Sequence, residues 1–130
     1  MKKLFISCPM RGRTEENIKK SMEKMHKLAE IIFDQELEVI PTYIEDNPPE
    51  DTRHSRVWYL GESIKKLSEA DYFIGIEWAG FYNGCNVESH VAECYDIPKY
   101  LINAYQFMPD VDEIVTKHYA QQSEVCPKNC

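Results

Sequence analysis

Glu88 is the residue of this sequence best placed for covalent chemistry. It follows the end of an apolar strand and lies in the first turn of a helix that we predict from about Asn86, within YNGCNVESHVAECYDIP at residues 82–98. The helix dipole favours the ionised form of a carboxyl group in that turn, and an ionised carboxylate is a nucleophile used in covalent catalysis. A glutamate there more commonly only stabilises its helix, and the sequence leaves both roles open.

The segment before this helix, EWAGFYNGCNVE at residues 77–88, has the composition of a ligand-binding loop. Its glycines allow the backbone to turn tightly and to approach a ligand, and its aromatic rings could stack on a flat base. Aromatic residues more often pack into a core or a lid. The candidate ligand-binding residues in this loop are Glu77, Trp78, Gly84 and Asn86.

A second candidate loop, CPMRGR at residues 8–13, follows the first predicted strand. Arg11, Gly12 and Arg13 come just before the start of a helix, where free backbone N–H groups and the helix dipole favour an anion such as phosphate. Solvated surface arginines are an equally good interpretation. Neither GxxxxGK[ST] nor GxGxxG is present, which removes the main support for an ATPase or a dinucleotide-dependent dehydrogenase.

Composition narrows the class of protein further. The chain has 130 residues, a formal net charge of −7, 43% hydrophobic residues and five cysteines. The net negative charge argues against a nucleic acid duplex as partner, and no apolar run is long enough to span a membrane. An odd number of cysteines without a CxxC pair, and four histidines without metal-ligand spacing, predict no disulfide framework, no metal site and no cofactor. We expect a cytoplasmic protein with reduced thiols.

Apolar periodicity predicts an alternation of strands and helices. Thr14 is the expected N-cap of the first helix, with Glu15 and Glu16 in its first turn. We predict strands at residues 4–7, 37–40, 72–77 and 100–102, and helices at 14–33, 57–67, 86–95 and 109–119.

This alternation predicts the α/β class, as a flavodoxin/Rossmann-like three-layer sandwich with a mainly parallel sheet of four to five strands. Residues 1–119 would form one domain and residues 120–130 a C-terminal tail. In a flavodoxin-like order the first and third strands are neighbours, so the loops after them would face one another across one crevice. Ligands of such sheets bind at that position.

The order and spacing of three motifs resemble the nucleoside 2-deoxyribosyltransferase-like superfamily, which includes the deoxyribonucleoside 5′-monophosphate N-glycosidases. The motifs read FISCPMRGR, EADYFIGIE and GCNVESHVAECYDIP, and the resemblance covers roughly residues 3–102. In that family the glutamate of the last motif attacks the anomeric carbon of the sugar, releases the base and leaves a glycosyl-enzyme ester. The resemblance therefore implies that Glu88 is the nucleophile.

The resemblance also implies a substrate site. The family's first loop holds the 5′ end of the nucleoside or nucleotide, which corresponds here to Ser7, Met10, Arg11, Gly12 and Arg13. Two arginines suit a 5′-phosphate better than a bare hydroxyl. Asp71, from the "AD" motif, joins the candidate substrate-binding residues. Family members complete their sites from a neighbouring subunit, so a homo-oligomer, a dimer or larger, is expected.

One position departs from the family pattern. Family members often carry an aspartate about eight residues before the "AD" aspartate, and Ser63 stands there in this chain. Unless Asp71, Glu77 or Glu45 replaces that acid, proton delivery to the leaving base is weakened.

Two functions follow from these observations. The first is an enzyme, an N-glycosidase or nucleoside deoxyribosyltransferase, that cleaves or transfers the N-glycosidic bond of a nucleoside or its 5′-monophosphate. The second is a nucleotide-binding module, a sensor or sequestering protein, that binds the same ligands without turnover. A flavodoxin-like partner domain is a weaker third hypothesis, because no Ser/Thr-rich phosphate loop follows the first strand.

Overall fold

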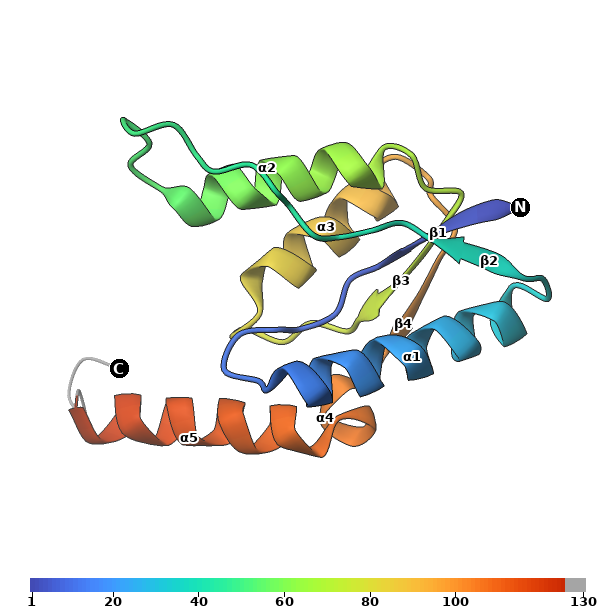
Figure 1. Ribbon diagram of the computed structural model, residues 1–130. Helices are drawn as coiled ribbons and strands as arrows, with labels where there is room; N and C mark the ends of the chain where they lie inside the picture. Colours follow the sequence, from blue (N-terminus) through green and yellow to red (C-terminus); the bar gives the residue numbers. More distant parts are fainter. Residues whose placement is uncertain (126–130) are drawn as a thin grey trace.

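Up to the fourth strand, strands and helices alternate along the chain in the predicted order, and two helices follow that strand. The structure, a computed structural model, describes the backbone of residues 1–125 and the side chains of residues 1–121 (Figure 1). Its elements are β1 (Lys2–Ile6), α1 (Glu15–Ile32), β2 (Leu37–Val39), α2 (Ser55–Leu67), β3 (Tyr72–Ile76), α3 (Asn83–Cys94), β4 (Lys99–Ile102), α4 (Ala104–Phe107) and α5 (Pro109–Val125).

The four strands form one parallel sheet in the order β2-β1-β3-β4. Leu4 pairs with Tyr72 and Ile6 with Ile74, which sets β1 directly beside β3. The predicted α/β class and parallel sheet are confirmed. So is the pairing of the first and third strands, which brings the loops after β1 and β3 to the same edge.

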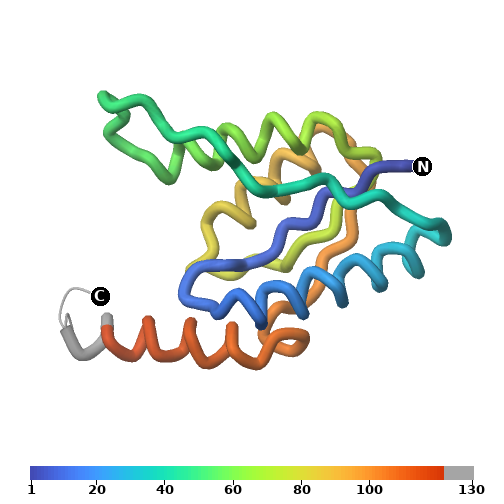
Figure 2. The backbone as a smooth tube through the Cα atoms, viewed as in Figure 1, coloured from blue at the N-terminus to red at the C-terminus, as the bar shows by residue number. Residues whose placement is uncertain are grey.

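Helices cover both faces of the sheet (Figures 1 and 2). Helices α2 and α3 lie on one side, and α1, α4 and α5 on the other. Successive strand residues point to opposite faces, and β1 shows this clearly. Leu4 and Ile6 join the core formed with α1 and α5, whereas Phe5 joins the core under α2 and α3 and stacks on Phe73 with ring centroids 5.7 Å apart.

Helix α1 begins as predicted. The Thr14 hydroxyl accepts a hydrogen bond from the backbone N–H of Asn17 at 3.2 Å, and Glu15 and Glu16 occupy the first turn. A threonine cap satisfies one of the N–H groups that a helix start leaves unpaired. This cap fixes where the first candidate loop ends.

Helix α3 begins three residues earlier than predicted. Asn83 and Gly84 resemble turn residues, but the turn is completed before them, where the Tyr82 N–H donates to the carbonyl of Ala79. Glu88 is therefore the sixth residue of the helix and lies in its second turn. The expectation that it occupies the first turn is wrong, and the dipole effect falls off beyond that turn.

The C-terminal part of the chain contains more helix than predicted. A short helix, α4, precedes α5, and α5 continues past Tyr119 to Val125. The remainder of the predicted tail, residues 126–130, lies outside the described residues. No helix within the described part of the chain is long and apolar enough to cross a lipid bilayer.

Candidate active site

A pocket of about 610 Å³ opens at the carboxyl end of β1, on the face of the sheet that α2 and α3 cover. Its walls come from the end of β1 and the first loop, from the start of the strap between β2 and α2, from α2, and from residues 81–85, 87 and 88. The pocket thus lies where ligands of such sheets bind, at the crevice between the loops after the first and third strands. Its volume is in the usual range for small-molecule sites, and most of its lining is apolar.

Glu88 lies in this pocket and is 8% exposed. Ser7, one residue past the end of β1, donates its hydroxyl hydrogen to Oε1 of Glu88 at 2.7 Å. Ser63 on α2 donates to Oε2 at 2.5 Å. Three separate elements therefore fix the orientation of the carboxyl group. Each of its oxygens has capacity for a further hydrogen bond or for bond formation.

Burial raises the pKa of Glu88 above its usual value, and the hydrogen bonds from Ser63 and Ser7 lower it in part. This raised pKa differs from the sequence-based expectation, because loss of solvent around a buried carboxylate is the largest effect here. No lysine, arginine or histidine of the described chain forms an ion pair with Glu88. A buried carboxylate without a cation destabilises a fold and is typical of functional sites.

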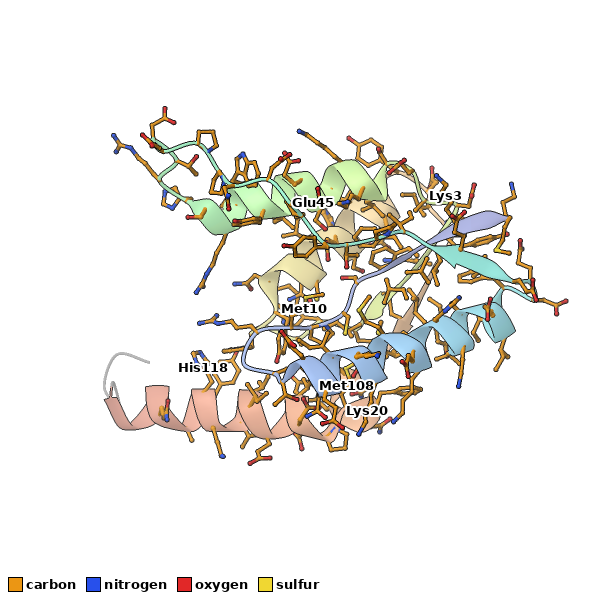
Figure 3. All side chains as sticks on the ribbon, in the orientation of Figure 1. Lys3, Met10, Lys20, Glu45, Met108 and His118 are labelled. Atoms are coloured by element: carbon orange, nitrogen blue, oxygen red, sulfur yellow. The ribbon has the colours of Figure 1, made fainter. Side chains whose placement is uncertain are left out.

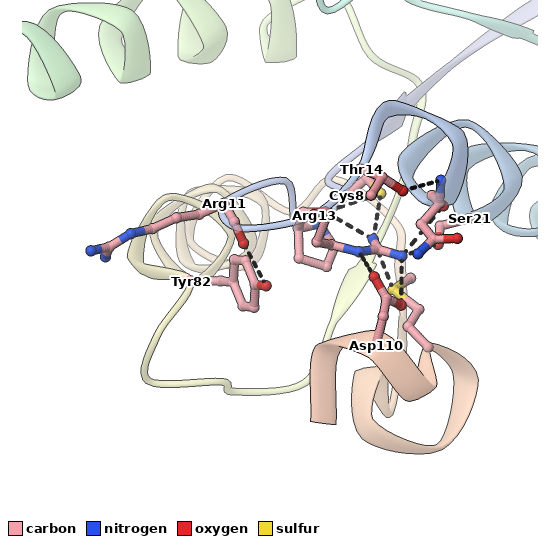
Figure 4. A network of polar contacts seen from close by, with 10 residues as sticks. Cys8, Arg11, Arg13, Thr14, Ser21, Tyr82 and Asp110 are labelled. Atoms are coloured by element: carbon pink, nitrogen blue, oxygen red, sulfur yellow. Dashed lines mark hydrogen bonds and ion pairs between the residues drawn. The ribbon is translucent and has the colours of Figure 1, made fainter. Parts of the chain in front are cut away.

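Two arginines line the pocket, Arg11 from the first loop and Arg56 from the first turn of α2. Arg11 lies over the ring of Phe81, 4.4 Å from its centroid, and its backbone carbonyl accepts a hydrogen bond from the Tyr82 hydroxyl at 2.9 Å. That bond joins the two candidate loops (Figure 4). Neither guanidinium pairs with a carboxylate of the described residues.

Arg13, predicted as a phosphate ligand, does not line the pocket. Its side chain is 1% exposed and pairs with both carboxylate oxygens of Asp110 on α5, with Nε 2.7 Å from Oδ2. It also donates to Ser21 Oγ at 2.6 Å and to the carbonyl of Pro9 at 2.9 Å. Figure 4 shows Arg11 and Arg13 pointing apart. Arg13 thus ties the first loop to α1 and α5.

Gly12 and Asn86 shape the loops without lining the pocket. Gly12 has φ +77°, and a Cβ there would lie 3.3 Å from the side chain of Ile114. Glycine suits such a backbone best. Asn86 donates to the carbonyl of Ala79 and accepts from its N–H, which closes the turn that precedes α3.

Some of the other predicted site residues line the pocket and some do not. Ser7, Met10 and Gly84 line the pocket, whereas Glu77 and Trp78 are exposed beside it and do not. Asp71 lies at the far end of the sheet, where it accepts a hydrogen bond from the N–H of Lys3. Figure 3 shows Lys3 and Met10 at opposite ends of β1 and its loop. Glu45, in the strap between β2 and α2, is exposed and also outside the pocket lining.

Two thiols, those of Cys8 and Cys85, also line the pocket. Burial raises the pKa of Cys8 to about 11 and that of Cys85 to about 12. Both thiols are therefore protonated at neutral pH and are poor nucleophiles. Among the described residues that line the pocket, Glu88 is the one with a carboxyl group.

Sequence reasoning missed Arg56 and the part played by Ser63. Arg56 directly follows the acidic, aperiodic stretch of residues 42–55 and gave no sign of facing the site. Ser63 was noted as a departure from a family pattern, and its contact with Glu88 required the packing of α2 on α3. Within the described residues, no group of three or more histidine, cysteine, aspartate or glutamate side chains could hold a metal ion.

Comparison of this chain with protein-family models, with curated proteins and with solved structures finds no match in any of the three. The case for a function therefore rests on the pocket, on its residues and on the sequence motifs.

Proposed function

We propose that this protein cleaves or transfers the N-glycosidic bond of a nucleoside or its 5′-monophosphate, with Glu88 as the nucleophile. The observation that carries the proposal is the Glu88 carboxyl group, buried in a pocket, held at both oxygens by Ser7 and Ser63, and without a cationic partner among the described residues. The resemblance of the three sequence motifs to nucleoside 2-deoxyribosyltransferase-like enzymes supports the same assignment.

The chemistry of an N-glycosidic bond suits such a carboxylate. As the bond to the base breaks, positive charge develops on the anomeric carbon and the ring oxygen. A carboxylate beside that charge stabilises it, and the stabilisation is greater in an apolar pocket than in water. Attack by one oxygen then gives a glycosyl-enzyme ester, which water or a second base resolves in a second step.

The rest of the pocket offers contacts for the other parts of a nucleotide. The free guanidinium groups of Arg11 and Arg56 are suited to a 5′-phosphate, since guanidinium and phosphate form paired hydrogen bonds. Tyr59, Phe81 and Tyr82 supply aromatic surface for a base. Arg56 takes the place that the sequence suggested for Arg13.

Chromatography of the purified protein with a panel of nucleosides and 5′-monophosphates, in ribo and deoxy forms, tests the proposal. Release or exchange of the base is expected with the wild type and should be lost in Glu88→Gln, which keeps the shape of the side chain. Glu93→Gln is the matched control, because Glu93 lies on the same helix and is 68% exposed in its side chain. Base release that survives in Glu88→Gln would overturn the role of Glu88.

A second function is favoured by one observation, the serine at position 63 where the resembled family often has an aspartate. The protein would then bind nucleotides in the same pocket without turnover. Calorimetry followed by chromatography separates the two functions. Tight binding with the ligand recovered intact supports the binding module, and product formation excludes it.

A further inference from the structure

The described residues that line the pocket supply one carboxyl group and no second carboxylic acid. Of the described residues that line it, only Glu88 is an aspartate or a glutamate. A serine, Ser63, occupies the position on α2 that faces this carboxyl group, with Oγ 2.5 Å from Oε2. The acids that sequence reasoning offered as substitutes, Asp71, Glu77 and Glu45, all lie outside the pocket lining.

Three further side chains of the pocket, those of Cys8, Tyr82 and Cys85, are weak acids. Burial raises the pKa of Cys8 to about 11 and the pKa values of Tyr82 and Cys85 to about 12. The Tyr82 hydroxyl already donates to the carbonyl of Arg11. Efficient proton transfer to a leaving group needs an acid with a pKa near the working pH. Among the described residues that line the pocket there is also no histidine and no second carboxyl group, so the usual proton donors for a departing base are missing.

Without a proton donor, the charge of the base as it leaves decides which substrates can react. A neutral purine or pyrimidine departs as an anion unless it receives a proton. A base that is already positively charged while it is attached to the sugar departs as a neutral molecule. Building on the proposed function, we propose that the pocket selects N-glycosides of cationic bases, in the form of pyridinium or N7-alkylated purinium nucleotides.

The charges in the pocket are complementary to such a ligand. A pyridinium or purinium 5′-monophosphate is positive at the base and negative at the phosphate. Glu88 supplies the carboxyl group of the pocket, which is negative when ionised, and Arg11 and Arg56 supply guanidinium groups that form no ion pair within the described residues. Tyr59 adds an aromatic ring face, which attracts a cation, whereas the Phe81 ring already lies against the Arg11 guanidinium. A neutral base would leave Glu88 without a cationic partner before the reaction begins.

The step balances without a proton donor. An oxygen of Glu88 forms a bond to the anomeric carbon as the carbon–nitrogen bond breaks. The electron pair of that bond goes to the nitrogen and cancels the positive charge of the base. Water then attacks the anomeric carbon, the ester electrons return to the Glu88 carboxylate, and the proton lost by the water passes to solvent. The sum is cationic nucleotide plus water giving sugar phosphate, neutral base and one proton.

Two matched substrates test this selection. Guanosine 5′-monophosphate and 7-methylguanosine 5′-monophosphate differ in one methyl group and in the charge of the base, and nicotinamide mononucleotide provides the pyridinium arm. Because a positioned general acid contributes about 10²–10⁴-fold to a rate, we expect kcat/KM to be at least about 100-fold higher for the cationic member of the pair. Equal values, or a preference for the neutral member, would overturn the selection and leave the proposed function standing. No base release from any substrate, including neutral deoxynucleotides, would overturn both.

A gain-of-function variant gives a second test. In Ser63→Asp a second carboxyl group would face Glu88. Two carboxyl groups at such a short distance share one proton, because they cannot easily both be ionised. We expect Ser63→Asp to raise kcat/KM for guanosine 5′-monophosphate relative to 7-methylguanosine 5′-monophosphate, and Ser63→Asn, which cannot donate an acidic proton, to leave that ratio unchanged. The same ratio in both variants would contradict the missing proton donor.

Discussion

Removing the Ser63 hydroxyl tests whether the two serines prepare Glu88 for attack. In the structure this hydroxyl donates to Oε2 of Glu88 at 2.5 Å, and it is one of the two side-chain hydrogen bonds that oppose the effect of burial on the pKa. In Ser63→Ala that pKa should rise further, because the ionised form loses a donor. The carboxylate also loses one of its two orientational restraints.

The expected size follows from the type of contact. A hydrogen bond to a charged group is worth about 1.5–3 kcal/mol. If that stabilisation is lost from the ionised nucleophile, kcat/KM should fall about 10- to 150-fold. The loss should be greatest at low pH, where the higher pKa leaves less of the carboxylate ionised. Ser63→Thr keeps a hydroxyl and should recover most of the rate.

Two measurements decide this prediction. The first is the pH profile of kcat/KM, whose acidic limb should move to higher pH in Ser63→Ala. The second is a titration of the Glu88 side chain by carbon-13 NMR in the free protein, which needs no substrate. Ser68→Ala is the control, since the Ser68 hydroxyl lies at the end of the same helix and donates to the carbonyl of Lys65. An unchanged titration of Glu88 in Ser63→Ala would refute the reasoning.

Three further predictions concern stability and ligand affinity. Glu88→Gln should melt at a higher temperature than wild type at neutral pH, because the raised pKa of Glu88 means that its ionised form destabilises the fold. The difference in melting temperature should vanish at low pH, where Glu88 binds its proton. An equal or lower melting temperature of Glu88→Gln at neutral pH would count against this prediction. Asp110→Asn should lower the free energy of unfolding by about 2–3 kcal/mol, below the range for fully buried pairs, because the Asp110 side chain is 25% exposed. Burial alone would raise the pKa of Asp110, but the hydrogen bond and charge of Arg13 lower it. The stabilisation by this ion pair is therefore present above the unfolded pKa of about 3.9 and is lost as the pH falls through the folded pKa. Urea titrations that show the same difference in unfolding free energy between wild type and Asp110→Asn at neutral pH and at pH 3 would contradict this. Arg56→Ala should raise KM for a 5′-monophosphate about tenfold and leave KM for the corresponding nucleoside nearly unchanged, which steady-state kinetics on both substrates can check.

The sheet and the place of the site follow from local sequence patterns. The apolar runs around Phe5 and Phe73 predict neighbouring buried strands, and the cap at Thr14 predicts where α1 begins; all three lie as expected. The crevice between the first and third strands then follows from topology alone. Such patterns are readable because each depends on residues close together in the chain or on the period of a single element.

The directions of individual side chains depend on distant partners and could not be read in this way. Arg13 and Arg11 are equivalent in the sequence, but Asp110, 97 residues away, draws Arg13 into an ion pair. The contact of Ser63 with Glu88 spans 25 residues and arises from the packing of α2 on α3. Asn83 and Gly84 mark turns in most settings, and here the Asn86 side chain completes the turn earlier, so the helix starts at Asn83.

The stereochemistry of the reaction tests the central role of Glu88 most directly. A glycosyl-enzyme intermediate requires two displacements at the anomeric carbon, so the configuration is retained. Reaction of a β-configured deoxynucleotide that the panel shows to be cleaved, in a water and methanol mixture, gives a methyl glycoside whose configuration is fixed and can be read by NMR. The account predicts the methyl β-glycoside, formed by the wild type and absent with Glu88→Gln. The methyl α-glycoside, or the same product from Glu88→Gln, would contradict it.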